Sequence, residues 1–200
     1  MTEKTSSAPT FITSPEQLVE GAFYCLPSEH AAIDRELDII AHSKKGLAEE
    51  ISDAMQQSSE TWHDNAPADV LFSHLKQLDQ KQARIVRAAR SLIEVPFPAE
   101  DVDVVTIGSR VTCDIAGDQF QLDVVGNVPV DGGQNADIER GTIDAPVPRS
   151  LLGKRAGETA VAHIADGRVM HIGVIAIDQK SQELEFQSQT RDKDSEISDS

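Results

Sequence analysis

Aromatic residues, cysteines and long apolar runs are all scarce in this chain of 200 residues. Aromatic residues make up 4% of the sequence, with a single tryptophan, and the apolar fraction of 39% is low for one compact globule. Cys25 and Cys113 belong to no CxxC pair, so we expect a reducing compartment and no disulfide framework. This composition suits an elongated helical part joined to a small compact part.

The chain also lacks the sequence features of membrane and secreted proteins. No stretch approaches the roughly 20 apolar residues that a membrane-spanning helix needs. The first 15 residues hold no apolar run behind Lys4, so they do not resemble a secretory signal peptide. We therefore expect a cytoplasmic protein without a membrane partner.

Basic residues are few, at 18 Lys and Arg against 34 Asp and Glu, which gives a net charge of −16. Such a charge repels nucleic acid, which argues against direct DNA binding through a basic face. A basic protein surface or a metal ion is the expected partner. The six histidines show no HxxxH or HExxH spacing, and no GxGxxG or P-loop is present. We therefore expect no nucleotide and no cofactor of the protein's own.

Two stretches, residues 33–54 and 71–92, have apolar residues at alternating spacings of three and four. This spacing is typical of a coiled coil. Lys44 and Gln82 each fill one position where the apolar series is interrupted. The apolar positions are Ile33, Leu37, Ile40, Leu47, Ile51 and Ala54 in the first stretch, and Leu71, Leu75, Leu78, Ile85, Ala89 and Leu92 in the second.

The two apolar series match each other in reverse order. If the chain turns back near residue 63, Ile33 faces Leu92 and each later layer also pairs, with Lys44 opposite Gln82. This match favours an intramolecular antiparallel hairpin in a monomer, and a parallel dimeric coiled coil is the alternative. Residues 58–69 would then form the tip of the hairpin.

The remaining chain divides by composition. Residues 1–14 and 179–200 are polar and are predicted to be a disordered arm and a disordered acidic tail. Residues 15–95 hold the helical part, and the proline-containing residues 96–102 are predicted to be a linker. Alternating runs at 102–107, 109–115, 120–126, 158–164 and 167–177 predict strands, and residues 146–158 predict a short helix closed by Gly153. The expected fold class is α+β.

The tip segment, "SSETWHDNAPAD", concentrates acids around the only tryptophan. In a purely structural interpretation, Asp64 or Asn65 caps the second helix and Trp62 folds back onto that helix. In a functional interpretation, Trp62 contacts a partner, because exposed indoles are enriched at interfaces. The sequence by itself leaves both open.

Residues 30–178 resemble the Gre transcript-cleavage factors of bacterial RNA polymerase. The resemblance lies in "IGSRVTCDI" at 107–115 and above all in "GTIDAPVPRSLLGKRAGETAVAHI" at 141–164. It implies an N-terminal antiparallel coiled-coil hairpin followed by a small, β-rich, FKBP-like domain. It also implies that the hairpin enters the secondary channel of RNA polymerase core, where the tip comes near the nascent RNA.

In the family, two tip acids help to hold Mg²⁺ in the polymerase active site, where the metal promotes cleavage of backtracked RNA. Asp64 and Asn65 align with the family's Glu-Asn pair, whereas Thr61 stands where the other acid is expected and Glu60 lies one residue earlier. The resemblance therefore implies Asp64 and Glu60 as catalytic acids that share the polymerase Mg²⁺. It implies Trp62 and Asn65 as partner contacts.

Lys154 and Arg155 follow the predicted short helix and form one of the few basic spots, so they are further candidates for contact with the polymerase. On this interpretation the protein is not itself an enzyme. One alternative is a Gre-like paralogue that modulates or inhibits the polymerase without cleavage. Another is an FKBP-like prolyl isomerase or chaperone, although Phe120 is the only aromatic residue of 103–178 that could line such a pocket.

Overall fold

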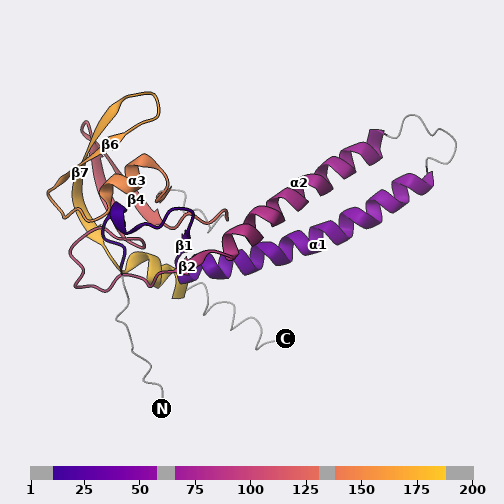
Figure 1. The fold of residues 1–200 in the computed structure, drawn as a ribbon, viewed down its shortest axis with the longest axis horizontal. Coiled ribbons are helices and arrows are strands. Elements are labelled where there is room, and N and C mark those ends of the chain that lie inside the picture. The colour runs from indigo at the N-terminus through magenta and orange to yellow at the C-terminus, as the bar shows by residue number, and fades with distance from the viewer. Residues whose placement is uncertain (1–10, 58–65, 131–137, 188–200) are drawn as a thin grey trace, which may run out of the picture.

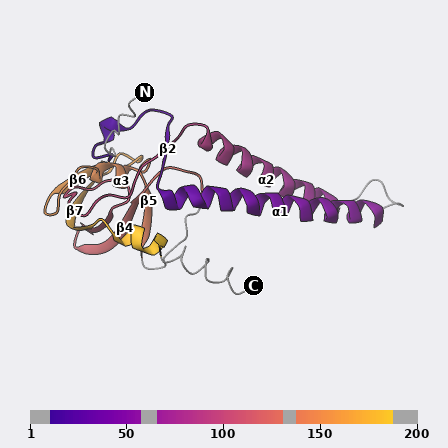
Figure 2. The same ribbon diagram turned by 90° about the horizontal axis from the view of Figure 1, so that it is seen from below.

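The computed structural model describes residues 11–57, 66–130 and 138–187. Two long helices, α1 (Pro27–Gln57) and α2 (Ala66–Ala89), extend together from a sheet domain. They lie side by side and run antiparallel in both views (Figures 1 and 2), and we call this pair the arm. The 31 residues of α1 give the arm a length of about 45 Å.

The first turn of α1 forms where the sequence offers a good helix start. Pro27 occupies the first helical position, at which its missing N–H costs no hydrogen bond. Two residues later, Glu29 Oε2 accepts a hydrogen bond of 2.9 Å from the backbone N–H of Leu26. This bond is one half of a capping box and satisfies an N–H group that has no partner within the helix.

The facing sides of the arm carry the predicted apolar series. Ile33, Ile40 and Ile85 are buried in one cluster, and Leu37 and Leu78 pack against it half-buried. In the gap of the series, Lys44 Nζ donates a hydrogen bond of 2.7 Å to Gln82 Oε1, which confirms the predicted polar pair. Near the other end of the arm, Ile51 and Ala68 are buried.

Two details of the predicted hairpin are wrong near its base. Ala88 is fully buried and Ala89 is exposed, whereas the alternating spacing placed Ala89 on the inner face. In addition, α2 ends at Ala89, and Leu92, the last position of the predicted apolar series, begins strand β2 (Leu92–Glu94). β2 pairs in parallel with β1 (Phe23–Cys25), so backbone pairing with a distant segment outweighs continuation of the helix.

The C-terminal part is a curled five-stranded sheet with the strand order β5-β4-β3-β7-β6. The pairing of β4 with β5 is parallel and the other pairings are antiparallel. One short helix, α3 (Pro146–Leu151), links β5 to β6 and agrees with the predicted helix. The strands are β3 (Arg110–Ile115), β4 (Asp118–Val125), β5 (Glu139–Thr142), β6 (Thr159–His163) and β7 (Val169–Asp178).

The segment that enters the sheet domain differs from its prediction. Residues 102–107 form no strand, although Val105 and Ile107 are buried in the core, because the alternation reflects burial of a loop. Within residues 96–102, predicted to be a linker, Pro98 is buried and Phe97 packs against the same core. This segment is therefore part of the sheet domain.

Both predicted disordered ends are partly ordered. Ile12, within the predicted disordered arm, is buried in the sheet-domain core. The backbone oxygen of Thr13 lies so close to Gly153 that a Cβ atom there would be 2.2 Å away, and Gly153 has φ +78°, so only glycine fits.

No helix among the described residues is long and apolar enough to span a membrane.

At the C-terminal end, residues 181–187 are helical, although 179–200 was predicted to be disordered. Asp178 Oδ1 accepts hydrogen bonds from the backbone N–H groups of Lys180 and Ser181, and hydrogen bonding, first with the Ser181 hydroxyl, lowers the pKa of Asp178. The guanidinium of Arg110 then binds Asp123 on one side and Glu185 on the other, each through two hydrogen bonds. These contacts fix the start of the tail to the sheet, an effect that its polar composition does not predict.

Candidate functional site

Four of the predicted site residues belong to the tip of the arm. Glu60, Trp62, Asp64 and Asn65 lie outside the described residues, so their predicted roles stay predictions. The segment that holds them joins the end of α1 at Gln57 to the start of α2 at Ala66. Those two helix ends are the parts of the arm farthest from the sheet domain (Figure 1).

Exposed apolar side chains flank this segment on both helices. Met55 and Val70 are each 56% exposed, and Phe72 is 46% exposed. Acidic residues lie beside them, with Asp53 and Asp69 exposed on the same stretches of helix. An apolar and acidic helix end of this kind suits a partner surface that is basic and partly apolar.

The base of the arm is fastened to the sheet domain through Glu29, which is 2% exposed. Its Oε1 accepts a hydrogen bond of 2.7 Å from Arg140 Nη2, and its Oε2 accepts one of 3.1 Å from the backbone N–H of Gly126. A buried carboxylate needs such partners, because an unpaired buried charge is strongly unfavourable. The first turn of α1 is thus held against β5 and the end of β4.

A close backbone contact completes this attachment. A Cβ atom on Gly126 would lie 1.9 Å from the backbone oxygen of Tyr24, so only glycine allows β1 to approach the sheet domain. The backbone N–H of Tyr24 also donates a hydrogen bond of 2.7 Å to Asn127 Oδ1. The arm therefore projects from a firm base, which fixes the direction in which its far end points.

Lys154 and Arg155 lie in the loop between α3 and β6. The backbone carbonyl of Lys154 accepts a hydrogen bond of 2.8 Å from the N–H of Val105, so this loop is held against the sheet-domain core. Arg155 is exposed and its Nε lies 3.2 Å from Asp103 Oδ2, an exposed ion pair that a partner carboxylate can replace. Both side chains lie on the sheet domain, away from the arm end that carries the other predicted site residues.

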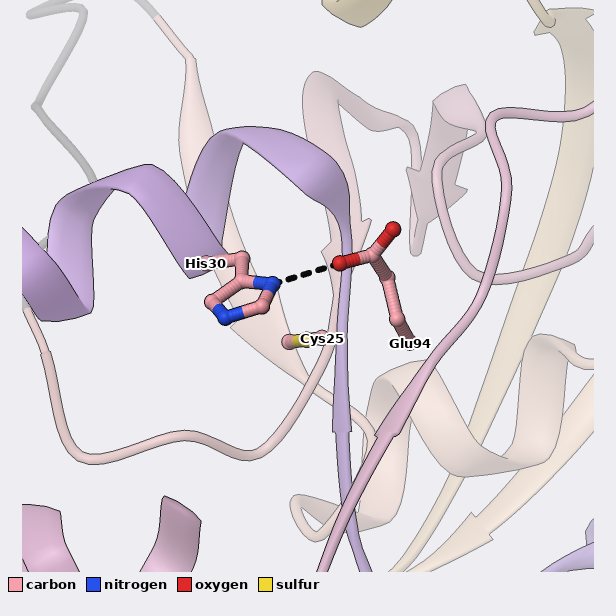
Figure 3. Close-up of side chains that lie close together, drawn as sticks. All are labelled: Cys25, His30 and Glu94. Carbon is pink, nitrogen blue, oxygen red and sulfur yellow. Dashed lines mark hydrogen bonds and ion pairs between the residues drawn. The ribbon is translucent and has the colours of Figure 1, made fainter.

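The structure also brings together three residues that the sequence analysis did not connect. Cys25 of β1, His30 in the first turn of α1 and Glu94 of β2 meet at the base of the arm (Figure 3). His30 Nδ1 and Glu94 Oε2 lie 2.5 Å apart. No motif of closely spaced ligands connects these residues, because they lie on three elements and neither strand was predicted. The pairing of Cys25 with Glu94 in the β1–β2 register was the information needed.

Comparison with known proteins gives one match to a protein family. Residues 99–179 match the family model described as "Transcription elongation factor, GreA/GreB, C-term". This range covers the sheet domain from the segment before β3 to the end of β7. No curated protein matches the chain significantly.

Similar solved structures include "GreA factor homolog 1 (Gfh1) protein of Thermus thermophilus", at 14% identity and a TM-score of 0.35, covering 78% of this chain and 99% of that one. Gfh1 of Thermus aquaticus gives 14% identity and a TM-score of 0.36, with 78% and 97% covered. The "Prokaryotic transcription elongation factor GreA/GreB from Nitrosomonas europaea" gives 26% identity and a TM-score of 0.31, with 55% and 88% covered. The similarity of this chain to the GreA/GreB family is thus shown for residues 99–179.

Proposed function

Because residues 99–179 match the C-terminal model of the GreA/GreB transcription elongation factors, we propose that this chain belongs to that family, binds bacterial RNA polymerase core and regulates elongation. The family match of the sheet domain is the observation that carries the proposal. The negative net charge agrees with a protein partner and with indirect contact to RNA. The protein would act in the cytoplasm as a monomer.

We further propose that the arm packs as a coiled coil and enters the secondary channel, while the sheet domain, FKBP-like in the family, docks outside. The arm's length of about 45 Å supports this proposal, since a helix pair of that length can carry a short segment deep into a channel. The firm attachment through Glu29 and Gly126 supports it too, because a loosely held arm would lose entropy on insertion. Met55, Val70 and Phe72 would contact the channel wall near the far end.

At the far end, Asp64 and Glu60 would act on the Mg²⁺ of the polymerase active site. Carboxylate oxygens are suitable ligands for this hard cation, and the polymerase would supply the others. A second cation held in this way stabilises the attacking and leaving oxygens of RNA cleavage. The protein would thus stimulate the intrinsic activity of the polymerase and would not be an enzyme itself. Trp62 and Asn65 would position the tip.

A second candidate function is modulation or inhibition of the polymerase without cleavage. One observation favours it: Thr61 stands where the family resemblance expects one of the two acids. Prolyl isomerase activity has less support, because Phe120, the only aromatic residue of 103–178, is half-buried and packs against the core. A pocket on this domain, next to Val102, Ile177 and Gln179, has no aromatic side chain in its lining.

The proposal is tested by binding and cleavage in one experiment. The full chain is expected to co-purify with RNA polymerase core at moderate salt, and absence of binding contradicts the proposed function. A backtracked elongation complex is then incubated with the wild type, with Asp64→Ala, with Glu60→Ala and with the control Asp69→Ala, which removes an exposed acid from the first turn of α2. Cleavage that is lost only in the first two variants supports cleavage stimulation, whereas binding without cleavage by any form supports the modulator.

A further inference from the structure

The Cys25, His30 and Glu94 group has the composition of a transition-metal site. A sulfur, a nitrogen and an oxygen ligand atom all lie within 4.8 Å of one another. Cys25 and Glu94 are direct neighbours in the parallel register of β1 and β2, and His30 comes from the helix turn that follows β1. The close-up shows the three side chains converging on one small volume (Figure 3).

We propose that Cys25, His30 and Glu94 bind a divalent zinc ion at the base of the arm. Thiolate, imidazole and carboxylate are the ligand types that zinc takes, and three protein ligands leave its fourth position to water. A cysteine ligand argues against Mg²⁺ and Ca²⁺, which prefer oxygen. The site is thus separate in chemistry and in place from the polymerase Mg²⁺ at the tip.

Small side-chain movements suffice to form the site. Ligand atoms around a tetrahedral zinc lie about 3.3–3.6 Å from one another. His30 Nδ1 and Glu94 Oε2, at 2.5 Å, share a hydrogen bond that the metal would replace by moving the two atoms apart. The sulfur lies within 4.8 Å of both, so it must approach by at most about 1.5 Å. The side chains of His30 and Glu94 are 47% and 50% exposed, so they can move and the metal can reach the site.

The charges around the site also favour a cation. The carboxylates of Glu29 and Glu94 both act electrostatically on the Cys25 sulfur, so the site carries negative charge. A bound zinc ion would take the sulfur as a thiolate and displace the thiol proton. Zinc binding should therefore release a proton and become tighter as the pH rises.

The site lies where both helices of the arm join the sheet domain, so a bound metal would affect how the arm is attached. β1 leads into α1 and β2 follows α2, so the three ligands come from both ends of the arm's connection to the sheet domain. A metal bound to all three would link these segments. Because it binds only the folded arrangement, it should raise the midpoint of thermal unfolding as its concentration increases.

The experiment uses the full chain after removal of metal with a chelator. Titration with Co²⁺ is expected to give one equivalent of binding and a thiolate-to-cobalt charge-transfer band in the near ultraviolet. Zn²⁺ should then displace Co²⁺ and remove the band. We expect His30→Ala and Glu94→Gln each to weaken zinc binding by more than about a hundredfold. Loss of an outer-shell partner costs about tenfold to hundredfold, and a direct ligand should contribute more. Both positions are half-exposed, so these variants should fold even if Cys25→Ser does not.

Matched controls locate the metal. Cys113→Ser removes the other buried thiol, and His42→Ala removes an exposed histidine of α1, so both should bind cobalt like the wild type. A wild-type protein without the charge-transfer band overturns the proposal. A band that persists in Cys25→Ser, or zinc affinities that are unchanged in both His30→Ala and Glu94→Gln, overturns it as well. RNA polymerase binding is measured separately, so failure of the zinc site leaves the proposed function standing.

Discussion

Lys44 Nζ of α1 lies 2.7 Å from Gln82 Oε1 of α2, and the same Nζ lies 2.5 Å from Asp79 Oδ1. These contacts form a polar layer between the two helices, whose facing sides also carry the buried Ile40 and Ile85. A polar layer of this kind costs stability relative to apolar residues, and it fixes the register of the two helices. It explains why the apolar series of both helices is interrupted at corresponding positions.

Replacement of this layer by leucine should stabilise the isolated protein. We predict that Lys44→Leu combined with Gln82→Leu raises the free energy of unfolding by about 1 kcal/mol or more, because apolar residues pack better than a half-buried polar pair. Urea unfolding followed by circular dichroism measures the effect. Lys45→Leu, at an exposed position, should give no gain. A destabilised double variant would contradict the interpretation of the layer.

Loss of Glu29 should loosen the base of the arm. We predict that Glu29→Ala lowers the free energy of unfolding by about 3 kcal/mol, since it leaves Arg140 and the Gly126 N–H without their buried partner. Arg140→Ala should cost less, because Glu29 keeps the two backbone donors. The exposed Asp34→Ala is the control. If Arg140→Ala lowered the free energy of unfolding more than Glu29→Ala does, the hydrogen bonds from the backbone to Glu29 would contribute little.

The buried thiols predict a loss of stability at alkaline pH. Burial raises the pKa of Cys113 to about 11, and burial with nearby carboxylates raises the pKa of Cys25 to about 12. Above the ordinary thiol pKa of 9.0 the unfolded chain loses these protons while the folded chain keeps them. Stability should therefore be unaffected by these groups below about pH 9 and decrease as the pH rises toward the folded values.

The metal-free protein provides the measurement for the thiols. Urea midpoints between about pH 8 and pH 11 should decrease for the wild type and decrease less for Cys113→Ser. At neutral pH, iodoacetamide should alkylate both cysteines slowly in the folded protein and rapidly in urea. Equal alkylation rates in the two states would mean that the thiols are accessible and that the inferred burial is wrong.

The start of the C-terminal tail should contribute to stability. A chain that ends at Asp178 loses Glu185, one of the two carboxylates on Arg110, and the ring contact between Phe97 and Phe186 at 6.1 Å. We predict a loss of about 1.5–3 kcal/mol, the range for a hydrogen bond to a charged group. A chain that ends at Gln187 should unfold like the full chain. Thermal unfolding distinguishes the two, and equal midpoints would show that residues 179–187 add nothing.

The sequence predicted those features that depend on repeated local patterns. The apolar series identified both arm helices and the facing of Lys44 and Gln82, and the alternation of residues located β3, β4, β6 and β7. The sequence did not predict elements that depend on pairing between distant backbone segments. Strands β1 and β2 have three residues each, which is too short for a recognisable alternation. The cluster of Cys25, His30 and Glu94 was missed for the same reason. The helical segment at 181–187 was missed because it depends on a contact with Arg110, more than 70 residues earlier.

We propose that the far end of the arm lies inside RNA polymerase during elongation. It is tested by placing a photoreactive amino acid at Val70, which is exposed near that end, and at Val19, which is exposed in the N-terminal segment. On illumination of elongation complexes, the probe at position 70 is predicted to crosslink to the catalytic subunits next to the active site, and the probe at position 19 is not. Binding of the protein without any crosslink from position 70 to those subunits would contradict the account.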